Sequence, residues 1–301
     1  MPNHVTNILS FQGDEKNIQA LRTAISSIKE DGEVMLIDFK KIIPMPESLN
    51  ITSGSQVDNG IAVLLFQRGK VSKDLNKMLD WPWVKSEGIT TTSELVDFLI
   101  KDNRVNLEEA AVALDNLEKY GYKDWYEWSY AKWGTKWNAY DMYELEDNAI
   151  QFDTAWSSPV SLIGTLSEMF PEVEISLKFA DEDFGHNCGE VTFLSGNVIT
   201  EDYPEGGSVE AFALAAHVKC SGEEEMLWRV CDSEDEEYTE KFLSMLFSKC
   251  KALAIIDALG EIDADCMTQL FLDTIKNNLI ELEEYELIKT VDDKISEFQN
   301  M

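Results

Sequence analysis

The sequence contains few basic residues for its length. Among 301 residues, 25 are Lys or Arg and 57 are Asp or Glu, which gives a formal net charge of −32. A protein that binds DNA or RNA needs cations that displace the counterions of the phosphates. The shortage of such cations argues against a nucleic-acid groove, and we expect no nucleic-acid partner.

Metal-ligating residues are also scarce. The only histidines are His4, His186 and His217, and none of the five cysteines forms a CxxC pair. A zinc site would therefore need unusual ligands. Reduced, mostly buried thiols are the expected state. We predict no metal and no cofactor.

Long apolar runs are absent. No stretch reaches the length that spans a bilayer, and the start, MPNHVTNILSFQG, has neither a basic segment nor the apolar segment of a signal peptide. We therefore expect a soluble, cytoplasmic protein without a membrane partner.

Motifs of nucleophilic and nucleotide chemistry are missing as well. The chain contains no GxSxG, Walker or GxGxxG sequence. His186 lies two residues before Cys188, on the same side if both were in a strand, which is a weak nucleophile–base pattern. The absent motifs favour a protein that is not an enzyme.

Two groups of acids still permit other chemistry. One could be read as a metal site, but the Gly and Glu of a calcium loop are out of register, which favours a solvated turn. Its members are Asp181, Glu182, Asp183, His186 and Glu190. The other could supply paired carboxylates for acid–base catalysis. Its members are Asp141, Glu144, Glu146 and Asp153.

The acids are concentrated towards the C-terminus. Residues 201–301 carry 25 acidic and 8 basic side chains, whereas the first 200 residues carry 32 and 17. Such a field suits a basic partner surface, including one that normally holds DNA, although charge alone favours solubility as its explanation. The candidate partner-binding residues are Glu223, Glu224, Glu225, Asp232, Glu234, Asp235, Glu236 and Glu237.

Hydrophobic periodicity predicts a β-α-β opening. Residues 3–11 alternate as a strand does, a helix follows from Asp14 to Gly32 with Ile28 on its buried face, and residues 34–39 form a second strand. The stretch KKIIPMPESL is expected to be a loop.

Residues 59–133 show helical spacing throughout and predict a helical insertion. Thr92 or Ser93 is expected to cap its third helix and Asn106 its fourth, which Gly121 ends.

The segment YKDWYEWSYAKWGTKWNAYD, residues 122–141, is unusually aromatic. It could stack nucleic-acid bases, form a ligand cage or fill a core. Because the segment lies between the insertion and the returning strands, core packing is the favoured interpretation, and a functional surface is the second. We expect four tryptophans to be largely buried: Trp125, Trp133, Trp137 and Trp156.

From 135 to 203 the pattern is β-β-α-β-β-β, with a hairpin at Gly196-Asn197. The predicted fold class is α+β, a ferredoxin-like antiparallel sheet with helices on one face and a helical insertion, followed by an acidic all-α region. The expected division places the ferredoxin-like domain at 1–204, its insertion at 59–133 and the acidic helical region at 205–301.

Four stretches resemble one known family. They are MPNHVTNIL, FKKIIPMPESL, YGYKDWYEWSYAKWGTKWNAYD and FDTAWSSPVSLIGTLSEMFPEVEISLKFAD. They are similar to the YubB-like ferredoxin-like proteins of phages and plasmids, over about residues 1–200. The resemblance implies a mobile-element protein in a bacterial cytoplasm. The residues that the family shares identify the domain and include no catalytic residues.

Two functions follow as hypotheses. The first is a non-catalytic inhibitor that binds a host anti-phage defence complex of the DNA-directed nuclease or helicase type through an acidic surface. The second is an enzyme that uses the carboxylates near the aromatic segment. We also expect the acidic region 205–301 to mediate assembly, either as a homo-oligomer or with a basic target.

Overall fold

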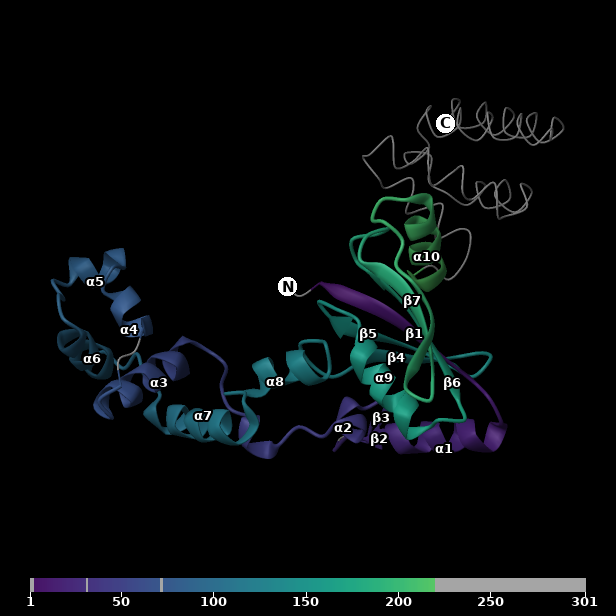
Figure 1. Cartoon of the computed structure of the whole chain (residues 1–301), viewed down its shortest axis with the longest axis horizontal. Helices are drawn as coiled ribbons and strands as arrows, with labels where there is room; N and C mark the ends of the chain where they lie inside the picture. Colours follow the sequence, from purple (N-terminus) through teal and green to yellow (C-terminus); the bar gives the residue numbers. More distant parts are fainter. Residues whose placement is uncertain (1–2, 31, 71–72, 220–301) are drawn as a thin grey trace, which may run out of the picture.

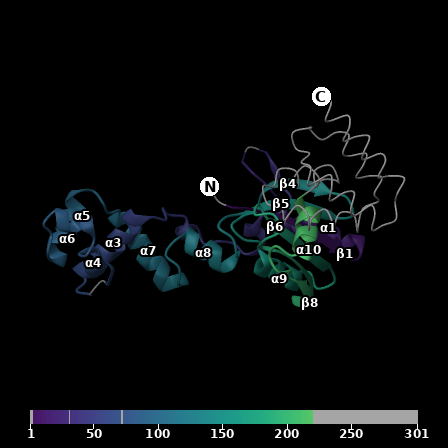
Figure 2. The same ribbon diagram turned by 90° about the horizontal axis from the view of Figure 1, so that it is seen from above.

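The computed structural model describes residues 3–30, 32–70 and 73–219. A sheet with packed helices forms one lobe, and a group of helices extends away from it as a second lobe (Figures 1 and 2). The strands are β1 (His4–Gln12), β2 (Ser27–Ile28), β3 (Val34–Met35), β4 (Tyr140–Leu145), β5 (Ala149–Ala155), β6 (Glu174–Asp181), β7 (Cys188–Leu194) and β8 (Asn197–Asp202).

Most helices of the described chain lie between β3 and β4. In chain order they are α1 (Glu15–Ile25), α2 (Phe39–Ile42), a 3-10 turn (Glu47–Leu49), α3 (Ser55–Gln67), α4 (Lys73–Met78), α5 (Pro82–Ser86), α6 (Thr92–Lys101), α7 (Leu107–Tyr120), α8 (Trp125–Lys132), α9 (Val160–Met169) and α10 (Val209–Lys219).

The main sheet has the strand order β4-β5-β1-β6-β7-β8, and every neighbouring pair is antiparallel. Strands β5 and β6 are connected by α9 and run parallel to each other, and β1 lies between them in the sheet. This arrangement is the split β-α-β unit of ferredoxin-like folds. The expected α+β class with an antiparallel sheet is confirmed.

The two faces of the sheet carry different side chains. Val5, Leu9 and Phe11 of β1 point into the main core, which α1 and α9 complete. Ile8 points to the opposite face, where α10 covers Ala180 and Cys188. The first helix of the region expected to be separate, α10, thus packs directly on the sheet.

The opening of the chain differs from its prediction. Helix α1 ends at Ile25, and Ile28 is 73% exposed in the short hairpin β2–β3, which forms its own two-stranded sheet. The predicted strand 34–39 stops at Met35 because Asp38 accepts the Lys40 N–H and starts α2. The β-α-β unit expected here was therefore wrong, and α2 replaces part of the expected loop.

The run of helices from α3 to α8 confirms the predicted insertion. Most of these helices enclose a core of their own, with Val63, Leu75, Leu95 and Leu99 at its centre. Since a buried cluster independent of the sheet stabilises these helices, the insertion forms a distinct lobe.

Three polar or flexible residues set helix ends in the insertion. Asn106 caps α7 as expected, and Gly121 ends it in the left-handed region at φ 80°. Helix α6, however, is capped by Thr91 in a capping box with Glu94, one residue before the predicted cap. The sequence spacing thus predicted α6 correctly, but its N-cap is Thr91 and not the expected Thr92 or Ser93.

The hairpin between β7 and β8 turns at Ser195 and Gly196, both with positive φ. Two such residues give the primed turn whose twist matches the flanking strands. The hairpin itself is confirmed, and the turn lies one residue earlier than the predicted Gly196-Asn197.

Candidate functional site

The aromatic segment divides between the core and the surface. Trp128 and Trp133 are 5% and 3% exposed, and their rings meet edge to face at 5.2 Å. Trp133 also contacts Phe39 and donates its indole N–H to the Ile43 carbonyl at 2.9 Å. This half of the segment packs the main core, as predicted for Trp133.

Tyr130 of the segment lies at the surface together with Trp156, which follows β5. Trp156 is 37% exposed and Tyr130 is 42% exposed, so the predicted burial of Trp156 was wrong. The ring centroids of Tyr130 and Trp156 lie 6.2 Å apart. The Tyr126 ring contacts both, with its centroid 5.8 Å from that of Tyr130 and 6.2 Å from that of Trp156. Trp125 and Trp137 are half-buried.

We define the aromatic patch as Tyr126, Tyr130, Lys136, Trp137 and Trp156. Its cation is Lys136, whose Nζ lies 4.6 Å from the Trp137 ring and 4.5 Å from the Trp156 ring. Tyr and Trp present large apolar rings with a polar edge and are enriched at protein interfaces. An exposed patch of this composition is a candidate binding surface.

Backbone geometry explains why Trp156 is exposed. Strand β5 ends at Ala155, and Trp156 has φ 74°, a left-handed conformation that is unusual for a bulky residue. The alternation of the strand stops there, and the Trp156 N–H donates to the Asn3 carbonyl at 2.8 Å. Strained residues of this kind persist only where the surroundings hold them, often at binding sites.

A buried polar network holds this turn. The Asn7 amide donates to Thr154 Oγ1 at 2.9 Å, and Thr154 Oγ1 donates to the Ser157 carbonyl at 2.9 Å. Ser158 Oγ donates to Asn7 Oδ1 at 2.6 Å. Asn7 and Thr154 are fully buried, so the network stabilises one backbone path at Trp156.

Acidic side chains surround the start of β1 beside the patch. Asn3 accepts from Trp156 and donates its side-chain amide to Asp181. Glu182 accepts the His4 N–H at 3.1 Å. We define the acidic rim as the acids near this end of β1: Asp141, Asp153, Glu182 and Asp183. The patch and the rim thus flank the same end of one strand.

Two titrating groups of this region are perturbed. Burial raises the pKa of Tyr140 to about 12, and the charges of Asp153, Asp141 and Glu182 contribute in the same direction. The Tyr140 hydroxyl bonds His4 Nδ1 at 2.7 Å. Burial also raises the pKa of Asp153 above the usual aspartate range. Burial is the main cause of both shifts; neighbouring acids add to that of Tyr140, whereas Lys219 and His4 lower the pKa of Asp153.

The carboxylates considered for acid–base catalysis do not converge. Asp141 and Asp153 lie near Tyr140, but Glu144 pairs with Arg22 of α1. Glu146 lies in the turn between β4 and β5. The four residues therefore do not form one site.

The other chemical candidates also separate in space. Cys188 is buried under α10, where burial raises its pKa and its Sγ donates to the Ala211 carbonyl. His186 lies in the preceding turn, half-exposed, 3.7 Å from Asp183. Within the described ranges no three His, Cys, Asp or Glu residues are placed to hold a metal ion.

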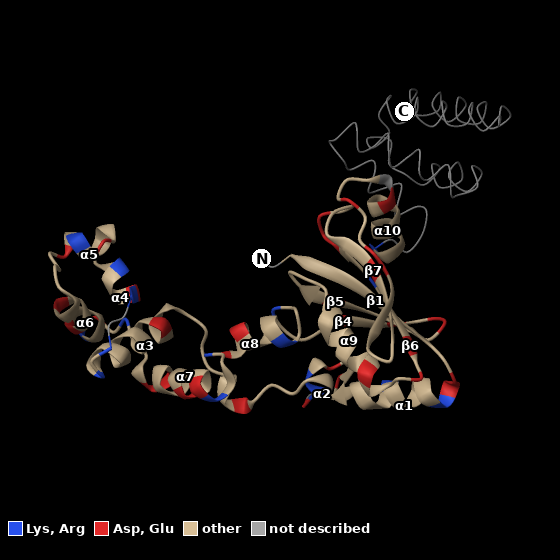
Figure 3. Cartoon of the chain, viewed as in Figure 1, with Lys and Arg blue, Asp and Glu red and all other residues tan. Residues whose placement is uncertain are grey.

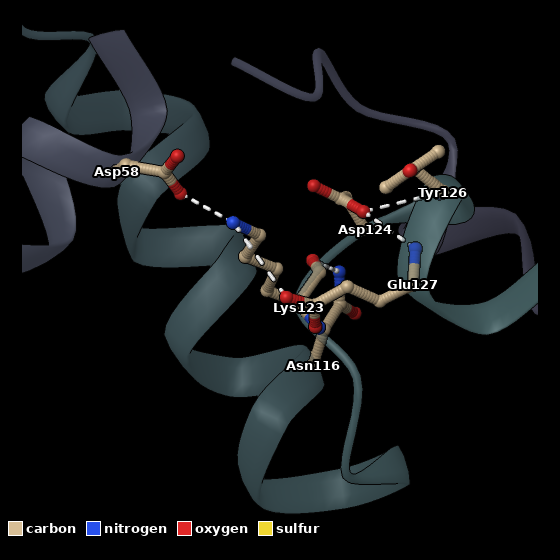
Figure 4. Close-up of polar contacts among 6 residues, drawn as sticks. All are labelled: Asp58, Asn116, Lys123, Asp124, Tyr126 and Glu127. Carbon is tan, nitrogen blue, oxygen red and sulfur yellow. Dashed lines mark hydrogen bonds and ion pairs between the residues drawn. The ribbon is translucent and has the colours of Figure 1, made fainter. Parts of the chain in front are cut away.

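A groove of about 560 Å³ lies in the insertion, between α3, α4, α7 and α8. On its rim Lys123 binds Asp58 of α3 at 2.5 Å and lies 3.6 Å from Glu127 of α8 (Figure 4). Both carboxylates raise the pKa of Lys123 against the opposing effect of burial. These ion pairs join α3 to α8, and both carboxylates are already engaged by Lys123.

Asp124 lies directly beside this network. It is fully buried and caps α8, accepting from the N–H groups of Tyr126 and Glu127 through Oδ1 (Figure 4). Its Oδ2 has no hydrogen-bond partner among the described residues. The cap fixes the start of the helix that carries both Trp128 and Tyr130.

The partner-binding residues predicted from charge, Glu223–Glu225, Asp232 and Glu234–Glu237, lie outside the described residues. The sequence did not single out the aromatic patch as a surface. The signal that could have found it is the bulky Trp156 followed by two serines and Pro159, which together indicate a turn.

Comparison with known proteins assigns the sheet region. Residues 132–226 match the family model described as the ferredoxin-like domain in Api92-like protein. The match begins after the insertion, so the N-terminal stretches used for the YubB-like resemblance lie outside it. No curated protein matches the chain.

Among solved structures, the chain is similar to the protein api92 from Yersinia pseudotuberculosis. The TM-score is 0.34 at 11% identity, over 68% of this chain and 99% of that one. At that TM-score we draw no argument from the likeness. No helix within the described parts of the chain is long and apolar enough to cross a membrane. The family match and the split β-α-β topology both support a ferredoxin-like fold, with the match restricted to residues 132–226.

Proposed function

We propose that this chain is a non-catalytic interaction protein that binds a basic surface of another protein. The observation that carries the proposal is the exposed aromatic patch next to the acidic rim. Aromatic anchors supply most of the affinity at many protein interfaces. Complementary charge increases the association rate and selects the partner.

The distribution of charge supports the choice of surface. Residues 133–219, which form most of the sheet, contain 16 acidic and 3 basic side chains. The insertion, residues 55–132, contains 13 and 10. In Figure 3 the blue segments lie mainly on the insertion and α2, whereas β7 and its surroundings are marked by red. A basic partner is therefore expected at the sheet lobe.

The expected partner is a host defence protein of the DNA-directed nuclease or helicase type, and the expected effect is inhibition. A protein that binds DNA presents Lys and Arg to the phosphates, and an acidic surface can occupy the same groove. The residues 223–237 named above would add charge of the same sign. In this proposal the chain is a mobile-element protein that acts in the cytoplasm of a bacterium.

The test is site-specific photo-crosslinking of the full chain in bacteria that carry such a defence complex. A photoreactive phenylalanine analogue replaces Tyr130 of the aromatic patch. The matched control carries the analogue at Tyr203, which is 52% exposed beyond β8. Defence is measured in parallel as protection against phage.

We expect position 130 to capture a Lys- and Arg-rich subunit of the defence complex, less at higher salt, while the chain abolishes protection. Two results would overturn the proposal. One is equal capture from both positions. The other is undiminished protection when the chain is present.

A further inference from the structure

The aromatic patch already holds a cation. The ammonium of Lys136 lies between the indole rings of Trp137 and Trp156, at 4.6 and 4.5 Å from their centroids. Cations bind the faces of tryptophan rings more strongly than those of other aromatic side chains. No ion pair of Lys136 occurs within the described ranges, so these two rings are the contacts that place its charge.

The two rings are held on a rigid frame. Thr135 is fully buried and donates its hydroxyl to the Ala155 carbonyl at 2.8 Å. The buried Ser129 of α8 donates to the Lys136 carbonyl at 2.6 Å. These bonds fasten the segment before Trp137 to both α8 and the end of β5. The backbone positions of Trp137 and Trp156 are therefore set by the fold and not by Lys136.

The side chain of Lys136 is the movable part of this arrangement. Lysine has a flexible four-carbon stem, and its ammonium can move into water at little cost. The backbone of Trp156 is bonded to Asn3 next to the Asn7–Thr154 network, and its ring contacts Tyr126 and Tyr130. If Lys136 moves away, the two tryptophan rings that contact its ammonium are left available to another cation.

We propose that Trp137 and Trp156 form a binding site for a cationic side chain, an ammonium or guanidinium group, and that Lys136 occupies this site until a partner's cation displaces it. Aromatic cages of this composition suit quaternary and primary ammonium groups. The identity of the partner rests on the proposed function. The acidic rim, at the same end of β1, would attract the same cation.

The experiment measures cation binding directly. The full chain is labelled with 5-fluorotryptophan, and fluorine resonances are followed while N-acetyl-trimethyllysine methylamide is added. A neutral analogue, with tert-butyl in place of trimethylammonium, separates cation binding from apolar contact. The variants are Lys136→Ala, which vacates the site, and Trp156→Gly, which removes one ring from a backbone that suits glycine.

Lys132→Ala is the matched control. Its ammonium lies 5.9 Å from the ring of Tyr122, outside the patch, so its removal leaves Lys136 between the indoles. We expect Lys136→Ala to bind the cation roughly tenfold more tightly than wild type, the factor for a site that is closed about nine times in ten. The Lys132→Ala variant should bind as wild type does, and Trp156→Gly should not bind.

Three results would each overturn the inference. They are equal affinity in Lys136→Ala and wild type, equal affinity for the neutral analogue, and binding retained in Trp156→Gly. Cation binding without crosslinking at position 130 would support the site and reject the proposed function. Crosslinking without cation binding would do the reverse.

Discussion

The two sides of the aromatic segment use the same residue types for opposite purposes. Trp128 and Trp133 are nearly inaccessible and contact each other in the main core, where Trp133 also contacts Phe39. Tyr130 and Trp156 are more than one-third exposed and contact each other at the surface. Composition alone does not separate these pairs, because both sets are large, amphipathic and close in sequence.

The difference comes from what holds each ring. Trp133 lies at the end of α8 and is enclosed by the sheet and α2. Trp156 follows β5 in a left-handed turn whose hydrogen bonds are to Asn3 and the Asn7 network. Burial stabilises the first ring, whereas backbone bonding holds the second without burying it. Removing rings, caps and charges one at a time should therefore separate the two sides.

The largest effect is expected at the core side. Trp133→Ala removes a buried indole and its bond to Ile43, which should lower the free energy of unfolding by about 3–5 kcal/mol. The measurement is urea denaturation followed by circular dichroism. A loss below 1 kcal/mol would mean that Trp133 is not part of the main core.

Loss of the α8 cap should affect both sides of the segment. Asp124→Ala leaves the N–H groups of Tyr126 and Glu127 without their acceptor, at a cost of about 1–2 kcal/mol. Asp124→Asn keeps the acceptor and should cost far less. Thermal unfolding of both variants checks this, and equal losses would show that the charge of Asp124 matters more than its capping bonds.

A smaller effect should distinguish strain from packing at the surface side. Trp156→Gly and Trp156→Ala remove the same ring, but only glycine adopts φ 74° freely. We expect the glycine variant to be more stable than the alanine variant by about 1 kcal/mol. Equal unfolding free energies would indicate that the turn relaxes once the indole is gone.

The smallest effect concerns pH. Burial raises the pKa of Asp153 in the folded state, so the folded protein binds more protons than the unfolded chain between the ordinary aspartate pKa and the raised one. Stability contributed by Asp153 is thus present below that window and lost as the pH rises through it. Asp153→Asn should remove this step from a plot of stability against pH. Asp141→Asn should keep the step and narrow it, because burial is the main cause of the shift and the charge of Asp141 only adds to it.

Local signals in the sequence were sufficient for several elements. The spacing of apolar residues with Asn106 before it and Gly121 after it predicts α7 almost to the residue. Alternation predicts β5, because Phe152 faces the core while Gln151 faces away. In these segments the residues that decide the structure lie within the segment or next to it.

The end of α1 and the short strand β3 were not predictable in the same way. The apolar spacing continues through Ile28, yet no element of the described chain buries that position and the chain leaves the helix at Ser26. Asp38 ends the next apolar stretch by capping α2, and its side chain is also held by Asn138, 100 residues away. A contact between residues so far apart in the chain cannot be predicted from the residues around Asp38.

By itself, the sequence determined the acidic charge, the helical insertion and the antiparallel α+β class, because composition and periodicity express them residue by residue. Tertiary structure alone decided which aromatic rings are buried and which form the patch. It also decided that α10 packs on the sheet and that Lys136 lies between Trp137 and Trp156. The physical reason is that each outcome depends on contacts between distant parts of the chain. The exposure of Trp156 and its contact with Lys136 depend on a backbone path held by hydrogen bonds to Asn3 and Asn7, near the N-terminus. The position of α10 depends on its packing against Ala180 and Cys188.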